Sequence, residues 1–384
     1  MKLIHVFTAP QTAYFFMNGQ LDFMISKGIE VTVIMPLDIE FNQKFKERQL
    51  NVKIINVNFA RNVSIIRDLI CLFQLFIIFL KKKPDIIHLH TPKASLLGVI
   101  AARLLFKKNI IYQMHGLVSA YGNNVQKGFS YVLERITCSF STQIFAVSES
   151  LKEFAIENKY CIPKKISVIA SGSINGIDFK DKFNFNKVNR NRINLGEITK
   201  NKFVIGFVGR LNMDKGIDDY LLILSKGIQK NLSIVGLVIG PDESKGEFNK
   251  LLEKYNLVKD RDIHLYGQQF EPEKFIIHFD ILLFPTKREG FGLVGAEANA
   301  LKVPVVGYDI PGFRDAIVNK QTGLLVDFEN TDQLLEAVLF YFNNPLIKKE
   351  HGENGRKRVV KDLDPKIIWK ELYFKYKNVK IINR

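Results

Sequence analysis

Short apolar runs alternate with longer helical stretches along almost the whole of this chain. Strands that alternate with helices pair in parallel, because each helix carries the chain back to the start of the next strand. We therefore predict an α/β fold with two open parallel sheets. The first sheet is expected to contain Leu3–Phe7, Val31–Met35, Val52–Val57, Ile86–Leu89, Ile110–Tyr112 and Gln143–Val147, and the second Phe203–Val208, Ile234–Ile239, Ile263–Tyr266, Ile281–Phe284, Val303–Val306 and Leu324–Val326.

A polar segment around residues 175–200, rich in Asn and Lys, separates the two series of strands. The chain of 384 residues also exceeds the size at which one hydrophobic core usually keeps growing. Because open parallel sheets bind ligands at the carboxyl ends of their strands, the expected active site is a cleft across which two domains face each other. We predict an N-terminal domain over 1–180, a linker over 181–200, a C-terminal domain over 201–365, and a helix over 366–384 that packs back toward the N-terminal domain.

Two glutamates, Glu289 and Glu297, bracket the segment EGFGLVGAE, which follows a predicted strand. Gly290 and Gly292 allow the backbone to approach a ligand closely, and the helix predicted after them points free N–H groups at an anion. Ionised carboxylates only accept hydrogen bonds, which suits sugar hydroxyls. The segment favours a nucleotide-sugar site, with Glu289 near the sugar and phosphate and Glu297 at the ribose, although the spacing alone fits an ordinary strand, loop and helix equally well.

Two cations follow the strand predicted at Phe203–Val208, in the segment GRLNMDKG. Gly209 turns the chain there, and Arg210 and Lys215 come after it. Arginine offers phosphate oxygens a planar fork of donors, and lysine offers a point charge. We predict that the pair holds a diphosphate and offsets the negative charge that builds on a departing nucleoside diphosphate.

The two motifs resemble those of the retaining glycosyltransferases of family 4. The similarity covers the second half, from GRLNMDKG through FPTKREGFGLVGAEANALKVPVVGYDIPGFRDAIVNKQTGLLVD, and includes NGID at 175–178. The first half is similar more loosely, through HTPKASLLG at 90–98 and Met114-His115-Gly116. The resemblance implies the GT-B architecture, with two Rossmann-like domains facing across a cleft, and an enzyme that builds bacterial capsule or O-antigen repeat units on a lipid carrier.

The resemblance also implies a role for each matching residue. Arg210 and Lys215 are expected to bind the donor diphosphate, Glu289 to lie beside the transferred sugar and Glu297 to hold the ribose. His115, at the end of a strand and before a glycine, matches a histidine that the family keeps beside the sugar. The expected catalytic residues are thus His115, Arg210, Lys215 and Glu289. Further donor contacts are expected from Gly209, Tyr266, Gln268, Gly290, Phe291, Gly292 and Leu293, with the base near 266–269.

The acceptor is expected to meet the N-terminal domain. Many family members carry a glycine pair in the first loop, whereas this chain has TAPQT, so Gln11 and Thr12 are predicted at the cleft. Lys93 is expected to meet an acceptor phosphate. His88 and His90 point to one face of a strand, but no third ligand at a useful spacing supports a metal site. We expect these histidines to support the loop that carries Lys93.

No divalent metal or other cofactor is expected, and the UDP-sugar is a substrate. Two Asp-x-Asp sequences, Asp260–Asp262 and Asp362–Asp364, resemble the metal motif of the other glycosyltransferase architecture in letters only. The first leads into a strand and the second lies where a helix cap is expected. Three cysteines fit no metal-ligand spacing and are interpreted as reduced thiols of a cytoplasmic protein.

Lys and Arg number 55 and Asp and Glu 39, a net charge of +16, and most of the excess lies in the first half. An anionic partner is therefore expected there, and no nucleic-acid-binding motif accompanies the charge. The apolar stretch Ile65–Leu80, followed by three lysines, is too short to span a bilayer. It fits a buried crossover helix, a helix in the membrane interface, or both. We expect peripheral association with the inner face of the cell membrane through the basic N-terminal half and Ile65–Lys83.

Taken together, the motifs favour a retaining, metal-independent glycosyltransferase. Its expected reaction moves an N-acetylated hexosamine or deoxyhexosamine from a UDP-sugar to a polyprenyl-diphosphate-linked saccharide. A UDP-sugar epimerase of the same architecture is an alternative, but it would leave the apolar helix and the basic half without a purpose. A non-catalytic membrane- or nucleic-acid-binding protein is a second alternative, and it has no need of a nucleotide clamp.

Overall fold

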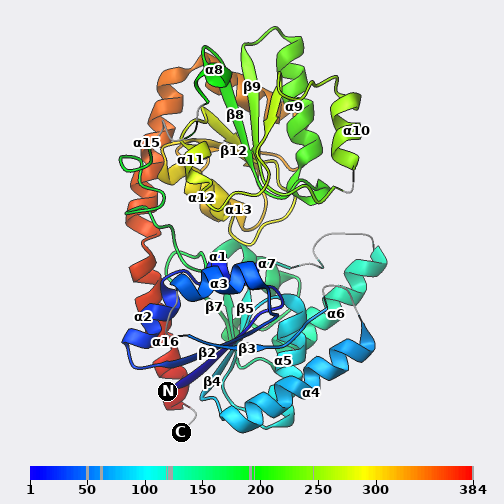
Figure 1. Cartoon of the computed structure of the whole chain (residues 1–384), viewed down its shortest axis with the longest axis vertical. Helices are drawn as coiled ribbons and strands as arrows, with labels where there is room; N and C mark the ends of the chain where they lie inside the picture. Colours follow the sequence, from blue (N-terminus) through cyan, green and yellow to red (C-terminus); the bar gives the residue numbers. More distant parts are fainter. Residues whose placement is uncertain are drawn as a thin grey trace. The chain divides into compact units, whose positions relative to one another are not determined.

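The computed structural model describes residues 1–48, 52–60, 64–117, 119, 124–189, 193, 195–244 and 246–382. The chain divides into two compact units. The first contains residues 1–176 together with helix α16 (Pro365–Ile382), and the second contains residues 177–364 (Figure 1).

All strands of the first unit pair in parallel, in the order β3-β2-β1-β4-β5-β6-β7. Reversal of the strand order beside β1 is the hallmark of a doubly wound sheet. The sequence missed β7, which is a run of only three residues. The strands are β1 (Lys2–Val6), β2 (Glu30–Met35), β3 (Lys53–Asn56), β4 (Ile86–Leu89), β5 (Ile110–Met114), β6 (Gln143–Ala146) and β7 (Ile166–Val168).

Helices cover the first sheet, and α5 packs against both α4 and α6 (Figure 1). Proline starts α1 and α5, because the first helical residue needs no N–H partner. Besides α16, the helices are α1 (Pro10–Phe16), α2 (Gln20–Ser26), α3 (Ile39–Arg48), α4 (Ile65–Lys82), α5 (Pro92–Leu104), α6 (Asn124–Phe140), α7 (Glu149–Glu157) and the short η2 (Pro163–Lys165).

The second unit repeats the same plan, with the parallel order β10-β9-β8-β11-β12-β13. The predicted fold class, two Rossmann-like parallel sheets, is confirmed. Its strands are β8 (Phe203–Val208), β9 (Ile234–Ile239), β10 (Ile263–Leu265), β11 (Ile281–Leu283), β12 (Val305–Tyr308) and β13 (Gly323–Val326). Its helices are α8 (Gly196–Thr199), η4 (Met213–Lys215), α9 (Ile217–Gln229), α10 (Glu247–Lys254), α11 (Glu273–Ile276), α12 (Leu293–Ala300), α13 (Phe313–Ala316), α14 (Thr331–Asn343) and α15 (Pro345–Asp362).

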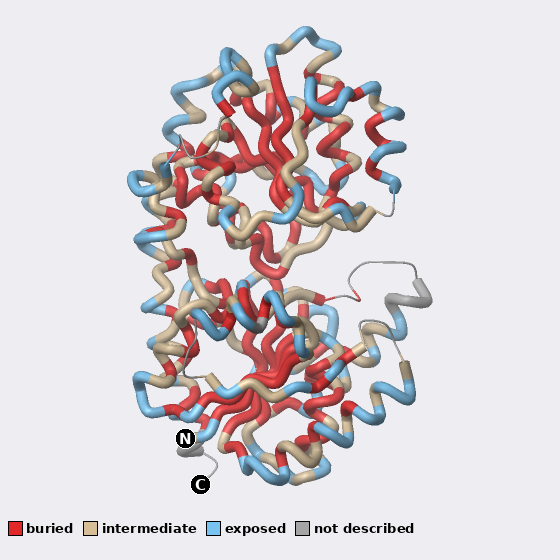
Figure 2. The backbone as a smooth tube through the Cα atoms, in the orientation of Figure 1, coloured by how far each residue is buried: buried red, intermediate tan, exposed pale blue. Residues whose placement is uncertain are grey.

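The strands of both sheets form the buried centre of each unit (Figure 2). In parallel sheets with helices on both faces the strands are apolar throughout, and β4, β5 and β9 are buried along their whole length. This pattern explains why continuous apolar runs, rather than alternating ones, marked the strands in the sequence.

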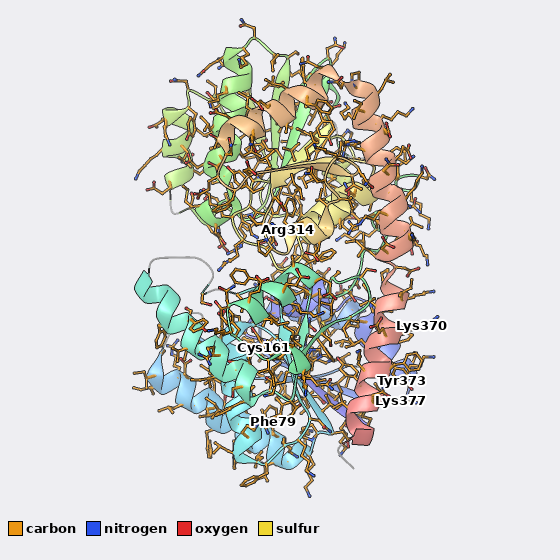
Figure 3. The ribbon with its side chains drawn as sticks, turned by 180° about the vertical axis from the view of Figure 1, so that it is seen from behind. Phe79, Cys161, Arg314, Lys370, Tyr373 and Lys377 are labelled. Carbon is orange, nitrogen blue, oxygen red and sulfur yellow. The ribbon has the colours of Figure 1, made fainter. Side chains whose placement is uncertain are left out.

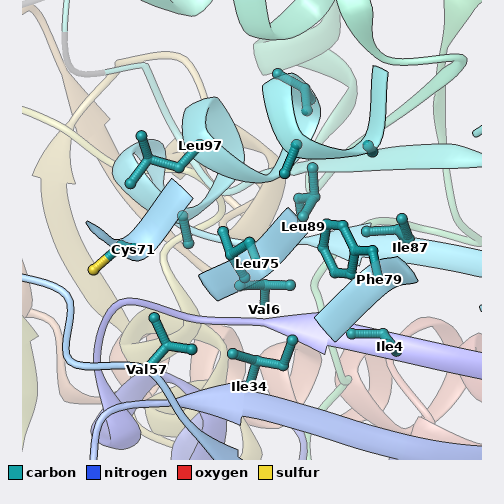
Figure 4. Packing of buried hydrophobic residues seen from close by; sticks show 14 of the residues in the cluster. Ile4, Val6, Ile34, Val57, Cys71, Leu75, Phe79, Ile87, Leu89 and Leu97 are labelled. Carbon is teal, nitrogen blue, oxygen red and sulfur yellow. The ribbon is translucent and has the colours of Figure 1, made fainter. Parts of the chain in front are cut away.

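Helix α4 is buried on one face only. Cys71, Leu75 and Phe79 lie four residues apart and pack over Val6 and neighbouring strand residues (Figure 4). The other face is exposed and apolar, with Ile65, Ile66, Leu69, Ile70 and Phe73, and the exposed lysines 81–83 follow. The buried crossover helix therefore describes the inner face of α4, while the helix in the membrane interface stays a prediction for the exposed outer face.

The hydrophobic face of α16 explains why this helix belongs to the first unit. Ile368, Leu372, Tyr376 and Val379 are buried, while Lys370 and Lys377 project outward with Tyr373 (Figure 3). Two polar contacts add to this packing. Trp369 Nε1 donates to Asn175 Oδ1 (2.6 Å), and His88 Nδ1 lies 2.6 Å from Tyr376 Oη.

The described part of the predicted linker at 181–200 lies in the second unit. Phe179 and Phe183 are buried, and Arg356 of α15 donates to both of their carbonyl oxygens. These aromatic residues attach the polar segment to the second unit. Residues 190–192 and 194 of the predicted linker lie outside the described residues.

Within the described residues, no helix combines the length and the apolar character that crossing a bilayer requires.

Candidate nucleotide-sugar site

The carboxyl ends of β8 and β11 bring the two predicted motifs together in the second unit. Lys215 ends the short helix η4, which Asn212 caps by accepting a hydrogen bond from the Lys215 N–H (3.2 Å). The Lys215 Nζ donates to Glu289 Oε1 and also approaches the Arg288 carbonyl oxygen (3.4 Å). The predicted cation and carboxylate, far apart in sequence, thus form one partly buried ion pair.

Arg210 lies in a second set of ion pairs beside the first. Its guanidinium donates to Glu243 Oε2 (3.0 Å) and lies 3.6 Å from Asp214 Oδ2. Asp214 also accepts from Arg288 (3.0 Å). Three cations therefore alternate with carboxylates at one sheet edge, and Arg210, with 39% of its side chain exposed, is the most accessible of the three.

Sequence reasoning missed three members of this network: Asp214, Glu243 and Arg288. Asp214 directly precedes Lys215 in the sequence, and Arg288 directly precedes Glu289. This adjacency to two predicted site residues could have identified both. Glu243 lies in the loop after β9 and reaches Arg210 only because β8 and β9 are neighbours in the sheet. No local pattern pointed to it.

Helix α12 starts directly after Gly292, whose φ of 81° lies in the left-handed region that favours glycine. The first N–H groups of a helix have no partner within it, and they give this end a partial positive charge. Leu293 supplies the first of these groups. The neighbouring Phe291 is buried, so its side chain serves packing, and what this segment can offer an anion is the start of α12 at Leu293.

Glu297 lies about one turn into α12, and burial raises its pKa to about 7. The Lys182 ammonium opposes this rise, whereas Glu273 adds to it. Lys182 donates to the Phe270 carbonyl oxygen (3.0 Å), and its Nζ lies 4.0 Å from Glu273 Oε2. Glu297, which is predicted to hold the ribose, therefore belongs to a cluster with Glu273 and Lys182. Lys182 comes from the segment predicted as a linker.

The raised pKa of Glu297 predicts that nucleotide affinity depends on pH. A ribose needs the ionised carboxylate as acceptor, so binding below about pH 7 must release a proton from Glu297. Affinity is expected to rise with pH up to about 7, by at most about tenfold per pH unit, and then to level off. Calorimetric titration with UDP at several pH values measures this.

Two variants and one control test the assignment of that profile to Glu297. Glu297→Gln should give weaker binding that no longer follows pH in this range. Lys182→Met should move the midpoint to higher pH, because the ammonium lowers this pKa, whereas Lys187→Met should not, because Lys187 pairs with Asp181 at the surface. A profile that Glu297→Gln leaves unchanged would contradict the assignment.

The predicted base site follows β10. The Tyr266 ring lies tilted against Phe275 (4.8 Å between ring centroids), its N–H donates to the Val238 carbonyl oxygen, and its own carbonyl accepts from Gln269 (2.6 Å). These two backbone groups of Tyr266 are thus engaged within the protein. Gln268 is exposed at the same loop.

The predicted acceptor residues lie at the carboxyl edge of the first sheet. Gln11 and Thr12 are on α1, after β1, and Lys93 is in the first turn of α5, after β4. The two loops are joined, because the Thr8 hydroxyl donates to Thr91 Oγ1 (2.7 Å). Lys93 is ion-paired with Asp68 of α4 (2.9 Å), so an acceptor phosphate would have to share it with this carboxylate.

His115 follows β5 at the same edge of the sheet. It lies beside a group of buried histidines. The sequence offered no third ligand at a useful spacing for His88 and His90, but the structure brings His5 beside them. His5 on β1 is the register partner of His88 on β4, and His5, His88 and His90 can place ring nitrogens within 4.8 Å of one another. Adjacent parallel strands created this proximity across more than 80 residues of sequence.

Comparison with known proteins is consistent with these features. Residues 21–174 match the Glycosyltransferase Family 4 domain, and residues 190–358 match Glycosyl transferases group 1. The capsular polysaccharide biosynthesis glycosyltransferase CapM of Staphylococcus aureus is 31% identical over 375 residues, which cover 98% of this chain and 96% of that protein.

A second relative is the UDP-Gal:alpha-D-GlcNAc-diphosphoundecaprenol alpha-1,3-galactosyltransferase of Escherichia coli. It is 29% identical over 297 residues, covering 73% of this chain and 72% of that protein. Among solved structures, HepE of Anabaena, crystallised with UDP and glucose, superposes with a TM-score of 0.79 at 16% identity, over 98% of this chain and all of that chain.

Proposed function

Because this chain belongs to the family 4-type glycosyltransferases with the GT-B fold, as its similarity to CapM over almost its whole length shows, we propose that it transfers a sugar from UDP to a lipid-linked saccharide. The product is a repeat unit of capsule or O-antigen. The acceptor is a polyprenyl-diphosphate-linked saccharide, and the transferred sugar is an N-acetylated hexosamine or deoxyhexosamine. The observation that carries the donor side is the network of Arg210, Lys215 and Glu289 beside the start of α12.

The site supports a diphosphate held between two kinds of positive charge. Arg210 and Lys215 come from the loop after β8, and the free N–H groups of α12 come after β11. Both cations are paired with carboxylates, so neither leaves an unpaired charge partly buried. A diphosphate exchanges those partners for its own oxygens, which bind arginine in the same forked geometry.

The proposed mechanism retains the configuration of the sugar. The acceptor hydroxyl attacks on the side of the leaving group, and the departing phosphate takes its proton. Negative charge then builds on the UDP oxygen that was bonded to the sugar. Arg210, Lys215 and the start of α12 stabilise that charge, while Glu289, tied to Lys215 and to Thr286 (3.3 Å), lies where it can bind sugar hydroxyls.

We propose that no divalent metal takes part. The donor set that faces the diphosphate is cationic, so it supplies the charge that a metal ion provides in other sites. The two Asp-x-Asp sequences are engaged elsewhere. Asp262 accepts from Arg261 and from the Val258 N–H, and Asp364 pairs with Lys180.

Two relatives support the nucleotide and the acceptor. The Escherichia coli relative is named for UDP-Gal and a diphosphoundecaprenol-linked GlcNAc. The Anabaena protein of similar fold was crystallised with UDP and glucose. Both proteins support uridine as the base, and the Escherichia coli relative alone supports a lipid diphosphate as the anionic partner of the basic first half.

A thermal-shift series with UDP, GDP and ADP on the wild type and on Glu297→Ala tests the donor site. UDP alone is expected to raise the melting temperature of the wild type, and the variant should lose most of that rise. Binding at a hundredfold excess over Kd stabilises by about 2.7 kcal/mol, which such a scan detects readily. A wild type that responds to no nucleotide, or equally to all three, would refute UDP as the donor nucleotide.

Membrane association is proposed through the outer face of α4. Ile66, Leu69 and Phe73 are 75%, 59% and 65% exposed, and they lie three and four residues apart on one side of the helix. The lysines 81–83 end the helix where phospholipid headgroups would lie. An apolar face beside a basic cluster is the arrangement that holds a helix in the interface of an anionic bilayer.

Replacing these three residues with glutamine is expected to lower binding to anionic phospholipid vesicles by at least about tenfold. Each apolar side chain that leaves the bilayer costs about 1.5–3 kcal/mol when fully inserted, and less when partly inserted. Vesicle co-sedimentation measures the change. The matched control replaces Val258, Leu346 and Val360, which are exposed apolar residues of the second unit, and should bind as the wild type does. Equal binding by all three proteins would contradict the proposal.

A further inference from the structure

Three histidines form a continuous chain of ring-to-ring contacts inside the first unit. His5 Nδ1 lies 2.9 Å from His90 Nε2, and His90 Nδ1 lies 3.2 Å from His115 Nε2. The chain runs from β1 through the end of β4 to the residue after β5, and so from the buried centre to the carboxyl edge of the sheet. His5 and His90 are completely buried, and His115 is partly exposed.

All rings of this group are neutral near pH 7. Burial lowers the pKa of His5 and of His115 to about 3, and it lowers the pKa of His88 and His90 well below the usual value. A neutral imidazole carries one N–H and one bare nitrogen. The two contacts of the chain therefore allow only two arrangements of protons, in which every hydrogen bond points either outward or inward.

The inner end of the chain distinguishes the two arrangements. His5 Nε2 is buried and has no hydrogen-bond partner. If the hydrogen bonds pointed inward, this nitrogen would carry a proton, and a buried N–H would have no acceptor. If they point outward, the same nitrogen is a bare acceptor. Buried N–H groups without a partner are rarer in proteins than under-satisfied acceptors, so the outward arrangement is favoured.

We propose that His5 and His90 are positioning residues that hold His115 as the Nδ1–H tautomer, so that His115 meets the sugar as a hydrogen-bond donor. His5 Nδ1–H donates to His90 Nε2, and His90 Nδ1–H donates to His115 Nε2. The lone pair of His115 Nε2 is then occupied and its Nδ1 carries the proton. His115 cannot accept a proton from the acceptor hydroxyl, so it does not act as a general base.

The surroundings hold the middle ring in place. His90 stacks on Phe7 and lies tilted against His88, with ring centroids 4.2 and 4.3 Å away. Its backbone N–H donates to the Val6 carbonyl oxygen. The next residue, Thr91, has a φ of 65°, which is strained for a β-branched side chain and is held by its hydrogen bond with Thr8. Strain of this kind is typical of functional sites.

The contacts among these histidines fit a chain of hydrogen bonds better than a metal site. His5 Nε2 and His88 Nε2 are unpartnered, but both nitrogens of His90 are engaged in the chain. Zinc in a protein needs at least three ligands, so a third nitrogen would come only by breaking a hydrogen bond.

Nitrogen NMR of the imidazole rings tests the proposal without any ligand, because the two nitrogens of each tautomer resonate differently. His5, His90 and His115 are expected to show the Nδ1–H pattern in the wild-type protein, and substitution of each in turn assigns its signals. The Nε2–H pattern at His115 would overturn the proposal. So would zinc bound in equimolar amount by the purified protein and lost in His5→Phe.

Activity adds a second readout, which rests on the proposed function. His90→Asn keeps an N–H close to the position of Nδ1, and His90→Leu removes it. We expect His90→Leu to lose the Nδ1–H pattern at His115 and to lower kcat by about tenfold, with KM for the UDP-sugar nearly unchanged, because one oriented hydrogen bond is lost. His90→Asn should keep both the pattern and most of kcat.

Equal losses in the two His90 variants, with the His115 pattern unchanged, would contradict the positioning role. If the wild type neither binds UDP nor transfers a sugar, the proposed function fails. The ring spectra of the wild type still decide the tautomer of His115 in that case, so the two failures are distinguishable.

Discussion

Replacing Arg210 with alanine is expected to lower kcat for sugar transfer by about 100- to 1000-fold, which is the usual effect of removing one donor aimed at a developing negative charge. Arg210 is the most exposed of the three cations at the site, and its guanidinium is paired with Glu243 and Asp214. Because the charge on the UDP oxygen grows only as the bond to the sugar breaks, the loss should appear in kcat more than in UDP affinity.

Steady-state kinetics and calorimetry with UDP separate these two effects. Arg314→Ala is the matched control, since Arg314 is an exposed arginine of the same unit that pairs with Asp309 (2.8 Å) outside the network (Figure 3). It should transfer sugar at nearly the wild-type rate. An Arg210→Ala enzyme with near-normal kcat would remove Arg210 from the mechanism and leave the charge stabilisation to Lys215 and α12.

Replacing Gly216 with alanine is expected to destabilise the second unit by about 3 kcal/mol or more. Gly216 has a φ of 74° and starts α9 directly after Lys215. An added Cβ would lie 1.9 Å from the Pro285 carbonyl oxygen, at the point where the loops after β8 and β11 meet. Backbone must therefore move, and the movement separates Lys215 from Glu289, so activity should fall as well.

Urea denaturation followed by circular dichroism measures the change. Gly246→Ala is the control, because Gly246 also has a positive φ, of 90°, but an added Cβ there has nothing within 4 Å. It should lose only about 1 kcal/mol, the cost of the backbone conformation alone. Equal shifts of the denaturation midpoint in the two variants would show that the contact between the added Cβ and Pro285 does not destabilise the second unit.

The regular elements could be predicted because their signals are local. Buried parallel strands are continuous apolar runs, so β4, β8 and β9 were predicted with their observed bounds, whereas the three-residue β7 was missed. The motifs around Arg210 and Glu289 were also visible, since glycines and charges at strand ends follow the chain order. The pairing of Lys215 with Glu289 was not predicted, because it depends on β8 and β11 being neighbours in the sheet.

The sequence by itself determined two parallel α/β sheets, the strand ends that carry the predicted site residues, and the family of enzymes to which the chain belongs. Only the tertiary structure decided which side chains meet across neighbouring strands. Strand order and register paired His5 with His88 and brought Glu243 to Arg210, and the packing of a non-strand segment against the second unit placed Lys182 beside Glu273. Register and pairing depend on contacts between residues far apart in the chain, and so does the burial that raises the pKa of Glu297. No local pattern of residues carries that information.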